Sequence, residues 1–320
     1  MLFLIQVFLL VMGFVILIKG ADWFVDGASS VALNFNVSKM LIALTIVSFG
    51  TSLPEFAVSV KSIVSGNGDI VLGNVIGSNI LNILLILGFS SLFHSLNVKT
   101  TTVKKELPIT LLISLLFVVL LSDNIFDKSI TNSFSRSDGV VLILFFSVFV
   151  YYLISMMRNK IDKDDESVKY SLASSFAFTI IGIICIVFGS NLVVNGASFV
   201  ASYFGVSDRM IALTVVALGT SLPELVTSVM ATRKGEYDIA IGNVVGSNIF
   251  NIGVVIGIPV CLFGGISNVS FSFVDIFVMI LSAFLLFLFS FRDKKITFYE
   301  GIIFLTVFTI YYSYVIFFNF

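Results

Sequence analysis

The chain has 320 residues, of which 58% are hydrophobic and 12% are charged. Soluble domains carry about 25% charged residues, so this composition excludes a single aqueous core and makes lipid the expected solvent. The formal net charge is −1 and no basic stretch is present, so no nucleic-acid partner is expected. The predicted class is therefore an all-α integral membrane protein.

Ten stretches are long and apolar enough to cross a bilayer, which takes about 20 mostly apolar residues. In chain order they cover about 2–32, 39–64, 69–94, 106–122, 138–157, 171–201, 208–232, 238–263, 272–291 and 298–318. The first begins without a basic segment or a small-residue cleavage site, which is typical of a retained span rather than a signal peptide. The first and sixth are long for a bilayer, so we expect them to tilt or protrude.

Positive charge is distributed unevenly among the loops. The loops after the first, third, fifth, seventh and ninth spans hold 13 of the 18 Lys and Arg residues. Because cytoplasmic loops are enriched in Lys and Arg, we expect these loops to be cytoplasmic and both termini to lie outside, in a plasma or inner membrane. Residues 158–170 are expected to form a solvated, charged cytoplasmic linker; a regulatory ion site on its acidic run is the alternative.

The two halves of the chain are related by a shift of 169 positions. Between residues 49 and 88 this shift gives 21 identities in 40 positions without a gap. We expect a first five-helix repeat at 1–157 and a second at 171–320, with the most similar parts at about 36–90 and 205–259. Because five is odd, the second half must enter the membrane from the opposite side. Inverted repeats of this kind are typical of secondary transporters, which bind substrate near the midplane.

The segment GTSLPE occurs in both halves, at Gly50–Glu55 and at Gly219–Glu224. Proline lacks an N–H and clashes with the carbonyl four residues earlier, so Pro54 and Pro223 are expected to break their helices. Freed carbonyls in hydrocarbon cost roughly several kcal/mol each unless they line a cavity or meet a partner. A bound cation is a suitable partner. A proline kink without a ligand is the alternative, but it does not explain why a Glu follows in both copies.

Glu55 and Glu224 are the carboxylates that we place near the bilayer centre. A charge at that depth costs about 2.5–3.5 kcal/mol on insertion scales. Two close carboxylates also repel each other, so that one would take up a proton. A divalent cation bound between them removes both difficulties.

A second repeated segment reads GNVIGSNILN from Gly73 and GNVVGSNIFN from Gly242. Its polar residues recur every four positions and so share a helical face, on which we expect Ser and Asn to face the site: Asn74, Ser78 and Asn82, and Asn243, Ser247 and Asn251. Its glycines are expected to allow close helix packing. Because every candidate ligand atom is oxygen, the segment favours Ca²⁺ or Na⁺ over Zn²⁺ or Cu⁺.

At these residues the chain resembles the sodium/calcium exchanger family of the Ca²⁺:cation antiporter superfamily. The segments GTSLPE and GNVIGSN match the two α-repeats of that family, and the likeness to its compact prokaryotic members covers nearly the whole chain. The resemblance implies ten transmembrane helices and antiport of Ca²⁺ against several Na⁺ by alternating access, with the long first and sixth spans sliding over a fixed core. It implies a functional monomer in contact with membrane lipid, no organic cofactor and no enzymatic activity.

Carried over to this sequence, the family pattern makes Glu55 and Glu224 the central Ca²⁺ ligands, shared with Na⁺ in the alternative state. The Ca²⁺ site is completed by the carbonyls of Thr51 and Thr220. The flanking Na⁺ sites are expected from Ser52, Ser78, Ser221 and Ser247, with the carbonyls of Ser48 and Ala217. Asn82 and Asn251 fall at the middle position. Some members have Asp at the position of Asn251, which leaves the stoichiometry and any K⁺ dependence of this chain open.

Three other functions are compatible with paired carboxylates in a membrane. A proton-coupled antiporter of Ca²⁺ or another divalent cation on the same fold would use Glu55 and Glu224 as proton acceptors. An ion channel with a two-Glu filter is less suited to inverted halves that share one site. An intramembrane hydrolase lacks a Ser/His pair at span depth.

Overall fold

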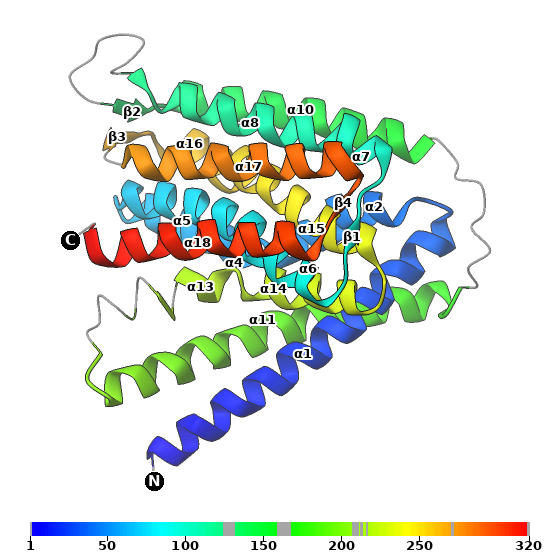
Figure 1. The fold of residues 1–320 in the computed structure, drawn as a ribbon. Coiled ribbons are helices and arrows are strands. Elements are labelled where there is room, and N and C mark those ends of the chain that lie inside the picture. Colours follow the sequence, from blue (N-terminus) through cyan, green and yellow to red (C-terminus); the bar gives the residue numbers. More distant parts are fainter. Residues whose placement is uncertain are drawn as a thin grey trace.

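The computed structural model describes residues 2–123, 132–158, 168–206, 211, 214–215, 217–269 and 272–318, which are almost entirely helical (Figure 1). In the first half the helices are α1 (Leu2–Phe35), α2 (Lys39–Ile42), α3 (Ser48–Thr51), α4 (Leu53–Val64), α5 (Gly68–Ile80), α6 (Gly88–Phe93), α7 (Thr100–Lys104), α8 (Glu106–Leu120) and α10 (Arg136–Arg158). In the second half they are α11 (Leu172–Tyr203), α13 (Ala217–Thr220), α14 (Leu222–Arg233), α15 (Tyr237–Phe250), α16 (Gly257–Phe263), α17 (Phe273–Asp293) and α18 (Phe298–Phe318). The π-helical segments whose bounds lie within the described residues are η1 (Ala43–Val47), η2 (Leu81–Leu87) and η4 (Asn251–Ile256).

The helices establish a multi-pass membrane protein. Among the described residues, seven helices are long and apolar enough to cross a membrane, and the bent pair formed by Lys39–Thr51 and Leu53–Val64 makes an eighth. Of the two other predicted spans, one corresponds to α8, which has 15 residues, and the other contains residues that lie outside the described part. The count of ten therefore remains a prediction. Most of the predicted linker, residues 159–167, also lies outside the described part.

Both GTSLPE segments interrupt a helix, as the prolines predict. α3 ends at Thr51 and α4 begins at Leu53, with a bend of 47° in the broken span. Ser52 lies between them with φ −85° and ψ 7°, and its counterpart Ser221 separates α13 from α14 with φ −91° and ψ 5°. The two breaks are therefore nearly identical in backbone conformation, and each places a new helix N-terminus in the middle of the protein.

The π-helical segments were not predicted from the sequence. η2 begins one residue before Asn82 and η4 begins at Asn251, and both continue into α-helix at a glycine. π-Segments within α-helices are uncommon and occur frequently at functional sites. Side-chain periodicity does not reveal them here, because LNILLIL and NIGVVI are apolar apart from one Asn each and so carry no polar stripe whose shift would mark an extra residue.

Two small antiparallel sheets join loops that lie far apart in the sequence. β1 (Leu96–Asn97) pairs with β4 (Lys295–Ile296), and β2 (Asn132–Phe134) pairs with β3 (Ile266–Val269). The first pair joins loops predicted to be cytoplasmic, and the second joins loops predicted to lie outside. Each sheet thus connects loops assigned to the same side, and the two sheets lie at opposite ends of the molecule (Figure 1).

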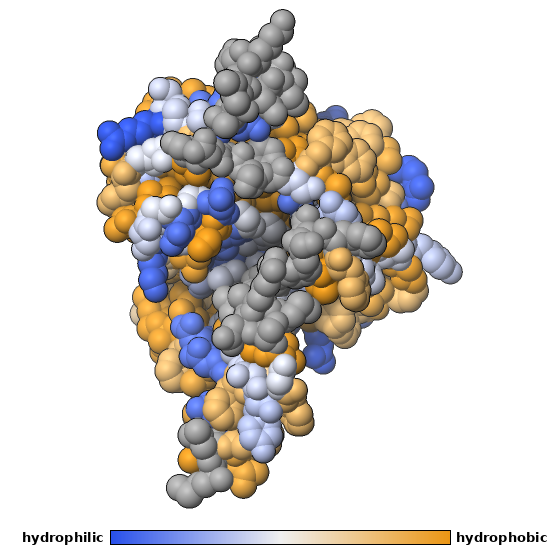
Figure 2. Space-filling view, turned by 90° about the vertical axis from the view of Figure 1, so that its left-hand side faces the viewer, coloured by the Kyte–Doolittle hydropathy of each residue, from blue (hydrophilic) through white to orange (hydrophobic). Residues whose placement is uncertain are grey.

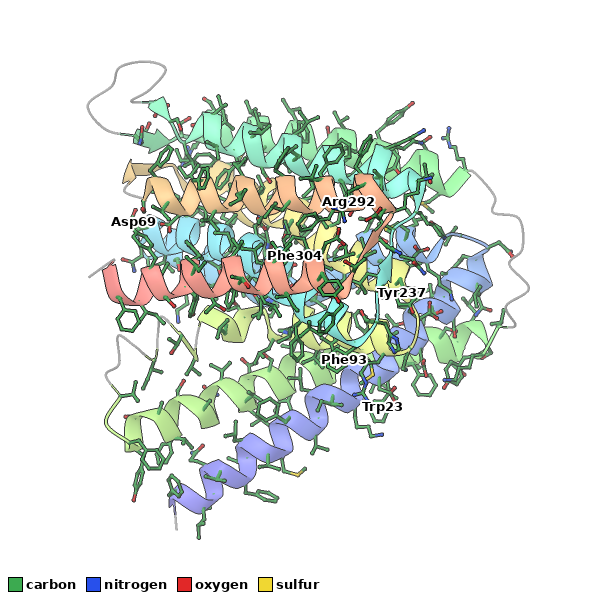
Figure 3. All side chains as sticks on the ribbon, in the orientation of Figure 1. Trp23, Asp69, Phe93, Tyr237, Arg292 and Phe304 are labelled. Atoms are coloured by element: carbon green, nitrogen blue, oxygen red, sulfur yellow. The ribbon has the colours of Figure 1, made fainter. Side chains whose placement is uncertain are left out.

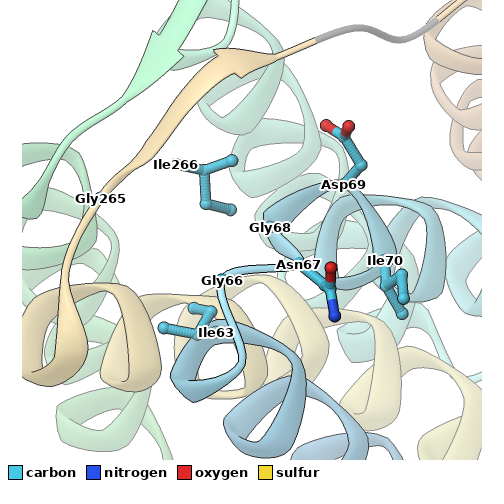
Figure 4. A pocket seen from close by; sticks show the side chains of 8 residues that line it. All are labelled: Ile63, Gly66, Asn67, Gly68, Asp69, Ile70, Gly265 and Ile266. Atoms are coloured by element: carbon cyan, nitrogen blue, oxygen red, sulfur yellow. The ribbon is translucent and has the colours of Figure 1, made fainter.

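The two ends differ in the residues that they present. Figure 3 places Asp69 at the end that carries β2 and β3, and Tyr237 and Arg292 at the end that carries β1 and β4. Figure 2 views the β2–β3 end, where hydrophilic residues lie among hydrophobic ones, with several of them to the left of the centre. A pocket of about 400 Å³ opens at this end between the α4–α5 turn and β3 (Figure 4), and it is lined by Ile63, Gly66, Asn67, Gly68, Asp69, Ile70, Gly265 and Ile266.

α1 and α11 form a tightly packed pair that lies along one side of the other helices (Figure 1). A Cβ atom added at Gly20 would lie 2.7 Å from Cys185 Cβ, and one added at Gly182 would lie 2.7 Å from the Phe24 backbone nitrogen. At these distances the helix backbones are in direct contact, which only glycine permits. Toward the broken helices, the contacts of Gly50 and Gly219 are with the side-chain tips of Ile183 and Val194.

The structure describes close packing by the GNV glycines of the second half. Gly242 packs against Ala43 and Met40, and Gly246 packs against Ser48, as the prediction of close helix packing requires. For Gly73 and Gly77, no atom of the described residues lies within 4 Å of an added Cβ. The prediction is thus confirmed for the second half.

Candidate ion-binding site

Glu55 and Glu224 lie in the first turn of α4 and of α14, immediately after the two helix breaks. Each is 1% exposed. The N-terminus of a helix carries a partial positive charge and free N–H groups, so both carboxylates are placed where negative charge is stabilised. The two carboxylates are also close enough to interact electrostatically. The chain therefore brings together, in its interior, two acidic residues that are 169 positions apart.

Each carboxylate receives a hydrogen bond from the broken helix of the other repeat. The Ser52 hydroxyl donates to Glu224 Oε1 at 3.0 Å, and the Ser221 hydroxyl donates to Glu55 Oε1 at 3.3 Å. These crossed contacts bind the two GTSLPE segments into one site. The sequence predicted both serines as site residues but did not predict that they would cross between the repeats.

Four buried oxygen atoms of the predicted ligand set lack a hydrogen-bond donor among the described residues. They are Glu55 Oε2, Glu224 Oε2, Asn82 Oδ1 and Asn251 Oδ1. An unpaired buried acceptor costs about 1–3 kcal/mol, and more when it is charged. The two carboxylate oxygens and the two amide oxygens come from repeat-related positions, and bound cations are suitable partners for such unpaired acceptors.

The remaining predicted hydroxyls lie around this centre. Thr220 contacts Glu55, and Thr51 and Ser247 contact Glu224. The Ser221 hydroxyl also donates to Ser78 at 3.4 Å. The predicted Ser, Thr and Glu residues thus contact one another across the two repeats, whereas Asn82 and Asn251 are hydrogen-bonded to Asn248 and Asn79. Ala217, the twelfth predicted residue, begins α13, which ends at the second break.

One predicted carbonyl ligand, that of Ser48, and one carbonyl freed by a proline, that of Gly219, have hydrogen-bond partners nearby. The Ser48 carbonyl accepts from Ser52 N at 3.1 Å, from Thr51 Oγ1 at 3.3 Å and from Ser247 Oγ at 3.5 Å. The Gly219 carbonyl, which Pro223 frees from the helix, accepts from the Ser190 hydroxyl of α11 at 3.0 Å. A side chain of α11 therefore provides the hydrogen bond for one freed carbonyl, for which the sequence predicted either a cavity or a bound cation.

Asn74 and Asn243 do not use their amide nitrogens at the centre, although they share a helical face with the other ligands. Asn74 Nδ2 donates to the Glu55 carbonyl at 3.2 Å and to Ser59 at 3.3 Å. Asn243 Nδ2 donates to the Glu224 carbonyl at 3.3 Å. These amide nitrogens hold the backbone of the two acidic residues, and Asn243 Oδ1 accepts from the Thr51 hydroxyl at 3.0 Å, so Asn243 also contacts a predicted ligand residue.

The sequence reasoning missed Asn79 and Asn248, which are buried beside the middle position. Asn82 Nδ2 donates to Asn248 Oδ1 at 2.9 Å, and Asn251 Nδ2 donates to Asn79 Oδ1 at 3.2 Å. A signal was present, since GSN recurs at the same shift of 169 positions. The i, i+4 pattern did not include its Asn, so the signal was passed over.

Two more acidic residues, the buried Glu106 and the half-buried Asp275, lie outside this centre. Glu106 begins α8 and accepts a hydrogen bond from Tyr152, and Asp275, its counterpart in the repeat, lies in the first turn of α17 and accepts from Tyr311 at 3.0 Å. Among the described residues no three His, Cys, Asp or Glu side chains gather in one place. The candidate site therefore consists of two carboxylates and a larger number of neutral oxygens, a donor set that suits Ca²⁺ and Na⁺.

The comparisons with known proteins agree with this site. The sequence profile described as "Sodium/calcium exchanger protein" matches residues 5–155 and 174–317. The "Sodium/calcium exchanger MaX1" of Methanosarcina acetivorans is 31% identical over 92% of this chain and 94% of its own length. The "Inner membrane protein YrbG" of Escherichia coli is 35% identical over 80% of each chain.

A solved structure of the sodium-calcium exchanger NCX_Mj, soaked with Na⁺ and Sr²⁺, superimposes with a TM-score of 0.83 and 33% sequence identity. The match covers 97% of this chain and 99% of that one. Fold, profile and full-length relatives agree with the motifs on which the resemblance was based. The chain belongs to the sodium/calcium exchanger family.

Proposed function

We propose that this protein is a sodium/calcium antiporter that exchanges Ca²⁺ for several Na⁺ by alternating access. The observation that carries the proposal is that Glu55, Glu224, Asn82 and Asn251, at repeat-related positions, each bury an oxygen to which no described residue donates. Ca²⁺ takes six to eight oxygen ligands, and the neighbouring hydroxyls and backbone carbonyls supply further ones. The transported ions are the substrates, and no organic cofactor is needed for this function.

The proposed architecture is ten transmembrane helices in two inverted five-helix repeats, residues 1–157 and 171–320, joined by a cytoplasmic linker at 158–170. Its support is the shift of 169 positions, the matching helix breaks and the two sheets that pair loops of the same predicted side. We place both termini outside the cell membrane on the distribution of Lys and Arg. The protein then works as a monomer, since one chain provides both halves of the site.

The charge of the site bears on the electrical character of the exchange. With Asn at both middle positions, Glu55 and Glu224 are the charged ligands. One Ca²⁺ balances their two negative charges, whereas three Na⁺ would leave one positive charge. Exchange of one Ca²⁺ for three Na⁺ is therefore predicted to be electrogenic, and the membrane potential is expected to change its rate.

The experiment that tests the function is transport in proteoliposomes loaded with Na⁺. Diluting the vesicles into Na⁺-free buffer that contains ⁴⁵Ca²⁺ should drive rapid Ca²⁺ uptake, because the outward Na⁺ gradient supplies the free energy. Vesicles with equal Na⁺ on both sides and vesicles without protein are the controls. Uptake that is indifferent to Na⁺ but follows an imposed pH gradient would replace the proposal with proton-coupled antiport on the same fold.

A further inference from the structure

Asn248 links the middle position of the site to the protein backbone. Its Nδ2 donates to the backbone carbonyl of Asn79 at 3.3 Å, and its Oδ1 accepts from Asn82 Nδ2 at 2.9 Å. Asn79, Asn82 and Asn248 are each at most 2% exposed. These bonds form a short chain that runs from a backbone carbonyl, through one side-chain amide, to a second one.

The order of donors in this chain allows one orientation of each amide. A backbone carbonyl only accepts, so Asn248 must direct Nδ2 toward it and Oδ1 toward Asn82. Asn82 must then direct Nδ2 toward Asn248, because two amide oxygens facing each other cannot form a hydrogen bond. The Asn82 oxygen is left on the opposite side, where no described residue donates to it.

We propose that Asn248 is a positioning residue that holds the Asn82 amide with its oxygen directed toward the cation. The inference rests on the proposed exchange function and names a residue that acts through a ligand rather than as one. If the amide turned over, Asn82 would present an NH₂ group, and a donor repels a cation. Asn79 is less constrained in this respect, since its own Nδ2 has no partner among the described residues.

The test is a double-mutant cycle in the exchange assay. Asn248→Ala should raise the half-saturating concentration of Na⁺ or of Ca²⁺ about tenfold. The variant removes the hydrogen bond that fixes the orientation of the Asn82 amide, and the free energy of about one hydrogen bond corresponds to a tenfold change in affinity. Asn82→Ala removes the amide on which Asn248 acts, so Asn248→Ala added to Asn82→Ala should change both concentrations less than about twofold relative to Asn82→Ala alone.

An equal loss of affinity in both backgrounds would show that Asn248 has only a structural role. Unchanged half-saturating concentrations in Asn248→Ala would overturn the inference as well. Failure of the wild-type protein to exchange Na⁺ for Ca²⁺ is a different result, since it would overturn the proposed function. The melting temperature of each purified variant shows whether a loss of transport reflects unfolding.

An independent observation concerns a cluster of ion pairs between α1 and the core. Lys234, directly after α14, contacts Asp22 Oδ1 at 2.6 Å and Asp26 Oδ1 at 2.7 Å, and it donates to the Asp22 carbonyl at 2.7 Å. Lys169, before α11, also pairs with Asp26. The Lys234 side chain is 22% exposed and that of Asp26 is 18% exposed, so solvent screens this cluster less than a surface ion pair.

The inverted repeat lacks this cluster at the opposite end. The shift of 169 positions places Asn191 and Asn195 on the two aspartates and Ser65 on Lys234, so no ion pair can form among them. The helix packing is also asymmetric. α1 packs closely along α14, whereas the repeat-related helices α11 and α4 hardly touch each other. Figure 1 shows α1 approaching the other helices at the end that carries β1 and β4.

We infer that the Asp22–Asp26–Lys234 cluster is a latch that keeps the cytoplasmic end closed and favours the state open at the other end. In an inverted repeat the opposite state requires α11 to pack on α4 and α1 to leave α14. That exchange breaks the ion pairs and forms none at Asn191, Asn195 and Ser65. The latch therefore shifts the equilibrium between the two states, and it does so without touching the cation ligands.

The latch is tested by pulsed electron paramagnetic resonance on spin-labelled protein in lipid nanodiscs. Labels at Phe35→Cys and Arg233→Cys, with Cys185→Ser and Cys261→Ser, report the separation of α1 from α14. Lys234→Ser, which installs the repeat-related residue, should add a population with a greater separation. The control Lys295→Ser removes an exposed charge at the same end and should leave the distances unchanged. A Lys234→Ser distribution identical to that of the parent protein would overturn the latch, whatever the exchange assay shows.

Discussion

Replacing either Glu55 or Glu224 with Ala is expected to abolish Na⁺-driven Ca²⁺ uptake, with a loss of at least about 100-fold. Each variant removes half of the negative charge that balances the divalent cation, and it leaves the other carboxylate as a single charge in the membrane interior. Both residues are 1% exposed, so water cannot replace the missing ligand easily. The initial rate of ⁴⁵Ca²⁺ uptake in proteoliposomes measures the effect.

Two controls separate loss of the ligand from loss of the fold. Glu55→Gln and Glu224→Gln keep the shape of the side chain and should be as inactive as the Ala variants while melting near the wild-type temperature. Glu106→Gln changes a buried carboxylate outside the site and can still accept the Tyr152 hydrogen bond, so uptake should be retained. Normal uptake by either Glu→Ala variant would contradict the assignment of the paired carboxylates.

Replacing Gly182 with Leu is expected to separate α1 from α11 and to destabilise the protein severely. An added Cβ at Gly182 would lie 2.7 Å from the backbone nitrogen and Cα of Phe24, and a backbone cannot move aside as a side chain can. Overpacking costs about 1–3 kcal/mol in soluble cores and more where the backbone must shift. The melting temperature of the purified protein in detergent should fall by many degrees, and transport should fall with it.

The matched control for Gly182→Leu is Ala177→Leu, on the exposed face of the same helix. This variant adds a side chain of the same kind that points away from the rest of the protein, so its melting temperature should stay close to that of the wild type. If the two variants were equally stable, α1 and α11 would not depend on backbone contact. That result would contradict the view that α1 and α11 move together as one unit over the other helices.

Much of the site could be predicted because it contains residues that are unfavourable in a membrane-spanning helix. Proline and glutamate destabilise a membrane-spanning helix unless a ligand or a partner group compensates, and the sequence has both at Pro54 and Glu55 and again at Pro223 and Glu224. Their repetition at a fixed shift identified both halves of the site. The helix breaks occur where the prolines predict them, and crossed hydrogen bonds join the Ser of each GTSLPE segment to the Glu of the other. Local chemistry and internal symmetry were sufficient for this part.

The features that could not be predicted depend on contacts between distant residues. The crossing of Ser52 and Ser221, and the amide bonds of Asn79 and Asn248, join positions that lie 166 to 172 residues apart. The cluster at Lys234 requires knowing that the end of α14 lies beside α1. A sequence lists the groups that can pair, but the packing of α1, α14 and α15 decides which of them do.

The most direct test of the central claim is a crystal structure of the protein soaked with Ca²⁺, with anomalous scattering used to locate the ion. We predict an anomalous peak between Glu55 and Glu224, with oxygen atoms of both carboxylates at about 2.3–2.6 Å, and its disappearance when Na⁺ is raised in competition. A Ca²⁺ peak elsewhere, or full Ca²⁺ transport by a protein whose paired carboxylates bind no ion, would contradict the account.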